Sequence, residues 1–222
     1  MEMAGVRMTT VVTPGGPSAT ERAGTRLERW YGWADAAMYV GLLNLLVLAF
    51  TLAGGVVLGW APALAAATAC SRTRLRGDSQ PLVRAFATRW RRGFLHANLL
   101  AAPSAAALTG LGLGLLTTTG ESRVLQFGLW AAAAVCLAHL VLVLTMDAHY
   151  ELRRVQCLRL AWAFLVRFPG APLLLIATTA LAVAVTAFVP GLLPVVAVGA
   201  WVHLCTALCL SFYAANDRNL AA

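Results

Sequence analysis

Residues 168–216 read FPGAPLLLIATTALAVAVTAFVPGLLPVVAVGAWVHLCTALCLSFYAAN, and none of these 49 residues is charged. Three further charge-free runs cover residues 36–71, 93–120 and 124–146. The hydrocarbon core of a bilayer is about 30 Å thick, and a helix needs about 20 apolar residues to cross it. The four runs therefore predict an integral membrane protein built from helices.

The composition of the whole chain agrees with a membrane location. Apolar residues make up 60% of the 222 residues and charged residues 12%, which leaves too little polar surface to cover a water-soluble globule. The 17 cationic side chains are all arginine. The five cysteines show no CxxC spacing, and we interpret them as reduced, small packing residues.

Proline and glycine divide the charge-free runs into spans. A Pro-Gly pair at 190–191 splits the longest run, and a helix break in the run 36–71 is predicted at Gly54, Gly55, Gly59 and Pro62. We predict an all-α polytopic bundle of about six membrane-spanning helices. The predicted spans cover residues 34–54, 60–76 (short or re-entrant), 94–118, 124–146, 171–189 and 192–214, between a disordered arm at 1–24 and a tail at 217–222.

Two amphipathic segments are predicted to be interfacial elbow helices, each leading into a span. In residues 81–94 the apolar residues recur every four positions, at Leu82, Phe86, Trp90 and Phe94. Residues 151–168 repeat the scheme with Val155, Leu158, Trp162 and Leu165. We expect the arginines of these regions to contact anionic lipid headgroups: Arg72, Arg74, Arg76, Arg84, Arg89, Arg91, Arg92, Arg153, Arg154 and Arg159.

The arginines are distributed asymmetrically along the chain. Six spans with both termini inside place every arginine except Arg123 on the cytoplasmic side, as the positive-inside rule requires. If residues 61–70 did not cross the membrane, the N-terminal arm and its four arginines would be exported. The six-span arrangement fits the rule better, so both termini are predicted to be cytoplasmic.

The first half of the chain resembles the YesL-type bacterial integral membrane proteins, a family of unknown function. The resemblance rests on LLNLLVLAFTLAGGVVLGWAPALAAATACSRTRLRG from Leu42 and on FLHANLL from Phe94. Its features are Asn44 to Leu46, the glycines of the break, Pro62 and Ala63, the basic run Arg72 to Arg76, and Phe94 with Asn98 and Leu99. It implies a bacterial plasma-membrane protein with an accessory role in carbohydrate uptake or its regulation.

Polar residues inside predicted spans are candidates for function, because such groups are costly in hydrocarbon. Asn44, His139 and His203 form a candidate intramembrane site, and hydrogen bonding between helices is the preferred alternative. Five residues at span ends could line a cytoplasmic vestibule or belong to solvated helix ends: His96, Asn98, Asp147, His149 and Glu151.

No catalytic, metal, cofactor or nucleic-acid motif is found in the sequence, so we do not expect an enzyme. Our first hypothesis is a non-enzymatic accessory protein that contacts anionic lipids and a membrane permease, a signalling partner or a second copy of itself. The alternative is a small-solute transporter or channel, with a midplane site where the first and second helices are broken.

Overall fold

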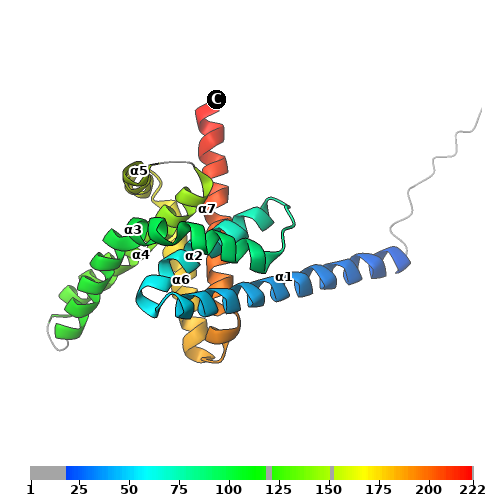
Figure 1. The fold of residues 1–222 in the computed structure, drawn as a ribbon, viewed down its shortest axis with the longest axis horizontal. Helices are drawn as coiled ribbons and strands as arrows, with labels where there is room; N and C mark the ends of the chain where they lie inside the picture. The colour runs from blue at the N-terminus through cyan, green and yellow to red at the C-terminus, as the bar shows by residue number, and fades with distance from the viewer. Residues whose placement is uncertain (1–18, 119–121, 151–152, 222) are drawn as a thin grey trace, which may run out of the picture. The chain divides into compact units, whose positions relative to one another are not determined.

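A computed structural model of the chain describes residues 19–118, 122–150 and 153–221. Within these ranges all regular structure is helical (Figure 1), which confirms the predicted all-α fold for the described residues. The helices are α1 (Ala19–Ala53), α2 (Val56–Leu75), α3 (Leu82–Thr117), α4 (Arg123–His149), α5 (Arg154–Arg167), α6 (Gly170–Phe188), the π-helical turn η1 (Leu193–Ala197) and α7 (Val198–Ala221).

The chain falls into two units, residues 1–38 and 39–222. The described part of the first unit is the beginning of α1, where Trp30, Tyr31 and Trp33 are 70–74% exposed. Exposed aromatic rings of this kind suit the headgroup level of a membrane. The predicted disordered arm lies outside the described residues up to residue 18, and residues 19–24 belong to α1.

Five helices among the described residues are long and apolar enough to cross a membrane. They are Trp30–Ala53 of α1, α3, α4, α6 and Leu193–Arg218. The remaining predicted span, residues 60–76, corresponds to α2, which has 20 residues but does not belong to this set. Helix α2 packs against α3, α4 and α7, and a helix enclosed by other helices needs less apolar surface than one that faces lipid.

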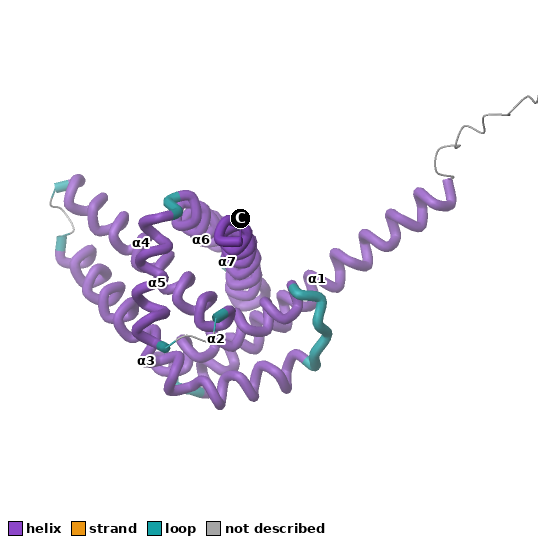
Figure 2. Tube along the Cα trace, turned by 90° about the horizontal axis from the view of Figure 1, so that it is seen from above, coloured by secondary structure: helices purple, strands orange, loops and turns teal. Residues whose placement is uncertain are grey.

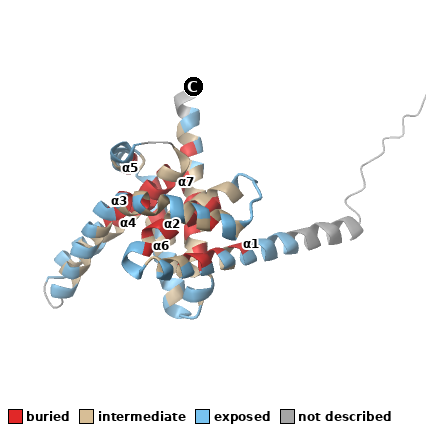
Figure 3. Cartoon of the chain, in the orientation of Figure 1, coloured by how far each residue is buried: buried red, intermediate tan, exposed pale blue. Residues whose placement is uncertain are grey.

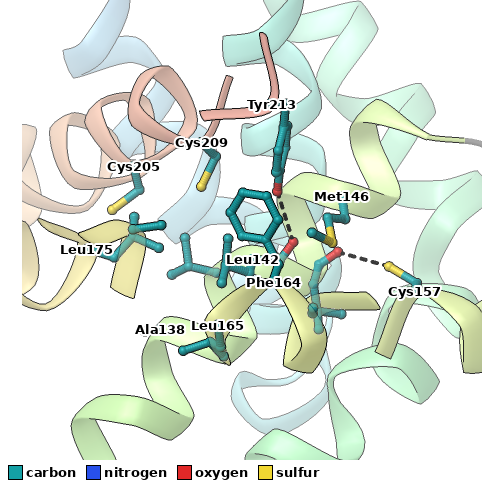
Figure 4. Packing of buried hydrophobic residues seen from close by; sticks show 14 of the residues in the cluster. Ala138, Leu142, Met146, Cys157, Phe164, Leu165, Leu175, Cys205, Cys209 and Tyr213 are labelled. Carbon is teal, nitrogen blue, oxygen red and sulfur yellow. Dashed lines mark hydrogen bonds between the residues drawn. The ribbon is translucent and has the colours of Figure 1, made fainter. Parts of the chain in front are cut away.

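Two pairs of helices lie side by side in both views of the chain, α3 with α4 and α6 with α7 (Figures 1 and 2). Buried residues concentrate where α2, α4 and α7 meet (Figure 3). The largest buried cluster joins α4, α5, α6 and α7, with Leu100 of α3, around Leu142, Phe164 and Tyr213 (Figure 4). Inside it, the hydroxyl groups of Thr145 and Tyr213 lie 2.8 Å apart.

The turn between α1 and α2 lies at the predicted glycine-rich break. Gly55 has a φ of 69°, a backbone conformation that glycine adopts without steric cost. A Cβ atom at Gly59 would lie 2.2 Å from the backbone oxygen of Thr51, so only glycine permits this close approach of the two helices. Helix α2 begins at Val56, earlier than predicted, and Pro62 lies inside the helix and is buried.

The first predicted elbow is not a separate helix, because residues 82–93 continue without interruption into the span as α3. Its apolar stripe faces protein: the ring of Phe50 in α1 lies 5.2 Å from the rings of Phe86 and Trp90. The second elbow is a separate helix, α5, whose buried face consists of Cys157, Ala161, Phe164 and Leu165. Of its predicted apolar stripe, Val155 and Trp162 are exposed instead. A four-residue period locates an apolar face but does not say whether protein or lipid covers it.

Candidate functional site

Asn44 is fully buried and binds the backbone at the start of the last span. Its Nδ2 donates to the carbonyl oxygens of Pro194 at 2.6 Å and Leu193 at 3.3 Å. Its Oδ1 accepts a hydrogen bond from the backbone N–H of Gly199 at 2.9 Å. The two acceptors are the first residues of the π-helical turn η1, and the donor Gly199 follows its end. The side chain therefore links α1 to an irregular stretch of backbone whose polar groups need partners in the membrane.

His139 of α4 contacts two other helices. Its Nδ1 lies 3.1 Å from Oγ of Ser104 in α3, and its Nε2 lies 3.5 Å from the carbonyl oxygen of Leu158 in α5. Both contacts are satisfied in the neutral tautomer with the proton on Nε2, because Ser104 then donates to Nδ1. The imidazole also stacks on Trp162, with ring centroids 4.6 Å apart. His139 is 2% exposed, so its hydrogen-bonding capacity is used within the protein.

His203 has different neighbours. Its ring meets the edge of Tyr39, with centroids 5.6 Å apart, and its Nδ1 is buried without a partner among the described residues. No hydrogen bond or ring contact joins Asn44, His139 and His203 to one another within the described ranges. The structure thus places Asn44 and His203 at the contact of α1 with α7, without a bond between them, and His139 where α3, α4 and α5 meet.

The predicted vestibule residues give one connected group, formed by His96, Asp147 and Arg154. Nε2 of His96 in α3 lies 2.8 Å from Oδ1 of Asp147 in α4. Nε of Arg154 in α5 donates to Nδ1 of His96 at 3.1 Å. Because Nδ1 accepts a hydrogen bond, the proton of the neutral ring is on Nε2 and is donated to the carboxylate. The group ties α3, α4 and α5 together at one end of the bundle.

The other vestibule residues lie elsewhere. Asn98 donates through Nδ2 to the carbonyl oxygens of Leu58 and Phe94, both at 2.9 Å, and so connects α3 to the beginning of α2. The ring of His149 lies 4.5 Å from that of Tyr150 and 5.2 Å from that of Tyr213. Glu151 lies outside the described residues. The structure therefore brings together two of the five predicted vestibule residues, His96 and Asp147.

Arg72 has a role that the sequence did not reveal. Its guanidinium donates to the carbonyl oxygens of Ala148 and His149 in the last turn of α4. A cation at the C-terminus of a helix satisfies carbonyl groups that have no partner within the helix. The two partners are 76 and 77 residues away in sequence, so no local motif indicates this contact.

Two ionisable groups near α5 are also held in their neutral forms. Burial, and after it the charge of Asp147, raises the pKa of the Cys157 thiol to about 12. The thiol lies 3.5 Å from the carbonyl oxygen of Val143, a contact drawn as a dashed line in Figure 4. Burial also raises the pKa of Tyr150, and the carboxylate of Asp217, 3.3 Å from its hydroxyl, adds to this effect. Neither group therefore supplies a nucleophile at neutral pH.

Five of the ten arginines assigned to lipid contact separate into two kinds. Arg72 and Arg154 bind protein acceptors, and Arg89 donates to Sγ of Cys70 at 3.0 Å and Oγ1 of Thr73 at 2.9 Å. Arg84 and Arg92 bind no protein acceptor within the described residues, and with Arg89 they line an open surface cavity of about 720 Å³. The residues around this cavity are Gln80, Pro81, Arg84, Ala85, Thr88, Arg89, Arg92, Gly93 and His96.

Comparison with known proteins gives two matches. Residues 40–115 match the profile of a family described as "Protein of unknown function, DUF624". The chain is also 29% identical over 133 residues to "Uncharacterized protein YesV" of Bacillus subtilis (strain 168). That alignment covers 58% of this chain and 64% of the relative, so it spans less than two thirds of the relative's length. No solved structure matches the chain significantly.

Proposed function

We propose that this chain, whose residues 40–115 match the profile of the DUF624 family of proteins of unknown function, is a non-enzymatic accessory protein of the cell membrane. In this proposal it binds a second membrane protein, a solute permease, and stabilises or regulates it. The link to carbohydrate uptake rests on the resemblance to YesL-type proteins. A signalling protein or a second copy of the chain would occupy the same surface in a related role.

The proposal rests mainly on the hydrogen bonds of two intramembrane polar side chains, Asn44 and His139, whose partners all lie within the protein. The side-chain amide of Asn44 is hydrogen-bonded to three backbone groups near the start of α7. Both ring nitrogens of His139 have partners as well, in Ser104 and Leu158. A transport site needs polar groups that can exchange protein partners for a solute. These two side chains have the environment of groups that hold helices together.

The cavities along the spans also support an accessory role. The cavity between α2 and α3 measures about 640 Å³ and that between α6 and α7 about 170 Å³. Their linings consist mostly of alanine, leucine and valine, with Asn98 and a few threonines as the polar members. Neither lining includes a charged residue, whereas coupled transport of an ion or a charged solute requires one.

The C-terminal half of α3 offers a surface for a partner helix. Cβ atoms added at Gly110 or Gly112 would meet nothing within 4 Å, and Leu113 and Leu116 are 59% and 71% exposed. Small residues let two helices approach closely in a membrane, and neighbouring leucines supply the packing. This half of α3 is therefore the proposed contact with the permease.

The alternative function, small-solute transport, is favoured by one observation. Nδ1 of His203 is buried and has no partner within the described residues, so it could accept a hydrogen bond from a bound solute. A transporter would show solute flux in liposomes, whereas the accessory protein would not. We propose that the accessory role is the correct one, because Asn44 and His139 lack such free atoms.

Site-specific photo-crosslinking in native membranes tests the accessory role. A photoreactive residue at position 110 should give one discrete adduct with a membrane permease. The same residue at position 142 is the matched control, because Leu142 is fully buried within the chain and should give no adduct with another protein. Absence of an adduct at position 110, in cells that express the chain together with their carbohydrate permeases, would contradict the proposed contact.

A further inference from the structure

The first third of α3 extends beyond the hydrocarbon core of the membrane. The helix has 36 residues, which span about 54 Å at a rise of 1.5 Å per residue. A bilayer core of about 30 Å accommodates roughly 20 of them. The apolar part of α3 is its C-terminal part, and the four arginines all lie within residues 84–92. We therefore expect these arginines to lie at the level of the lipid headgroups.

The polar face of this segment forms a continuous row. Arg84, Thr88, Arg92 and His96 follow one another every four residues of α3, and all of them line the 720 Å³ surface cavity, together with Gln80 just before the helix. Residues four apart lie above one another on one face of a helix. Helix α3 contains no acidic residue over its whole length, so no carboxylate of α3 neutralises the row.

The arginines of the cavity differ in how they are held. Arg89 is fixed by Cys70 and Thr73 of α2 and by Oε1 of Gln80 at 3.4 Å. Arg84 and Arg92 are exposed, and within the described residues their guanidinium groups make no hydrogen bond or ion pair. The cavity thus combines one immobilised cation with two guanidinium groups whose donors are free for a ligand.

We propose that this cavity is a binding site for phosphate groups, with Arg84 and Arg92 as the two ligand-binding residues. A guanidinium presents a planar pair of donors that matches a phosphate in a bidentate manner. The two residues are eight positions apart, about 12 Å along the helix axis, so each can bind its own phosphate group. Arg89 raises the local positive potential without being required for direct contact.

The phosphate can come from two sources, an anionic phospholipid headgroup or a soluble phosphorylated solute. Both present the same anionic oxygens to the cavity, which is open at the headgroup level. The phosphate site goes beyond the proposed function and does not depend on the permease contact. The site lies in the N-terminal part of α3, whereas the permease contact is proposed for its C-terminal half. Failure of one proposal therefore leaves the other standing.

The test uses the full-length protein in an uncharged maltoside detergent. Apparent dissociation constants are measured for short-chain phosphatidylglycerol, for short-chain phosphatidylcholine and for inorganic pyrophosphate. The double variant Arg84→Gln/Arg92→Gln removes both proposed ligand-binding residues. The double variant Arg91→Gln/Arg159→Gln is the matched control, because it removes two exposed arginines that do not line the cavity. Both variants should unfold at the wild-type temperature.

We expect phosphatidylglycerol to bind more tightly than phosphatidylcholine, and the Arg84/Arg92 double variant to bind it about 30-fold more weakly, since each arginine near an anionic surface contributes about one kilocalorie per mole. Tight pyrophosphate binding lost in the same variant would identify a soluble phosphate as the ligand. If both double variants bound phosphatidylglycerol equally weakly, the effect would be general charge attraction, and the proposed site would be wrong. The proposed site would also be wrong if none of the three probes bound to the wild-type protein.

Discussion

Asn44 and Gly199 are paired across the α1–α7 contact: Oδ1 of Asn44 accepts a hydrogen bond from the N–H of Gly199 at 2.9 Å. A Cβ atom at Gly199 would lie 2.9 Å from the backbone nitrogen of Asn44 and 2.4 Å from the backbone oxygen of Val40. The absence of a side chain at position 199 thus allows the approach that the amide of Asn44 then secures. This pairing explains why a fully buried amide lies in a span.

Replacing Asn44 by leucine should destabilise the bundle without removing any apolar contact. The variant leaves the N–H of Gly199 and the carbonyl oxygen of Pro194 without their present partner. Such a loss costs about 1–3 kcal/mol. Unfolding of the purified protein in mixed micelles measures the change. Thr109→Leu, at an exposed position, is the control and should alter stability by less than about 0.5 kcal/mol; equal stabilities of the two variants would argue against the role of Asn44.

Replacing Gly199 by alanine should also destabilise the protein, since the added methyl group overlaps backbone atoms of α1. Overpacking of this kind costs about 1–3 kcal/mol. Gly112→Ala makes the same chemical change at a site where the new Cβ meets nothing within 4 Å. Its stability should be unchanged or slightly raised, because alanine favours the helix. Thermal unfolding of the two variants side by side decides the matter, and an unaffected Gly199→Ala would contradict the close approach.

Cys157 should react slowly with a maleimide. Its pKa is raised to about 12 by burial and by Asp147, so the reactive thiolate is scarce at pH 8 and increases only as the pH approaches 12. The measurement uses a chain in which Cys70, Cys136, Cys205 and Cys209 are replaced by alanine. In the same background, Gln156→Cys with Cys157→Ala places a thiol at the adjacent exposed position. We expect labelling of Cys157 to be at least about a hundredfold slower; equal rates would show that α5 does not bury this thiol.

The proposed orientation places the loop between α2 and α3 in the cytoplasm and the loop between α3 and α4 outside. It follows from the positive-inside rule, because 16 of the 17 arginines then face the cytoplasm. In a cysteine-free chain, Ser122→Cys should react with an impermeant maleimide on intact cells. Asp78→Cys should react only after the membrane is permeabilised. Labelling of position 78 from outside would contradict this orientation.

The sequence predicted those features that depend on local composition. Charge-free runs predicted the spanning helices, and the glycines predicted the turn between α1 and α2. The stretch from Leu42 to Leu99 predicted a family resemblance, which the profile match over residues 40–115 supports. The continuous helix α3 was not predicted, because the stripe from Leu82 to Phe94 was assigned to the membrane surface. In the structure Phe50 of α1 covers that stripe, and a periodic pattern does not identify its partner.

The arrangement of the candidate site was less predictable, because it depends on contacts between residues far apart in sequence. The pairing of His96 with Asp147 joins residues 51 positions apart, and Arg72 reaches the end of α4 across 76 positions. The sequence identified His96 and Asp147 as polar residues at helix ends but gave no sign of Arg154 as their third member. Likewise, nothing local separates Arg89, which binds α2, from Arg84 and Arg92, which face the cavity.

Solute flux into liposomes tests most directly the claim that the intramembrane polar groups hold helices together and do not form a transport path. Purified wild-type protein and the Asn44→Leu and His203→Leu variants are reconstituted and assayed with a panel of sugars and cations. The predicted result is flux equal to that of protein-free liposomes for all three proteins. Flux in the wild type that is lost in a correctly folded variant would contradict the claim and establish the protein as a transporter.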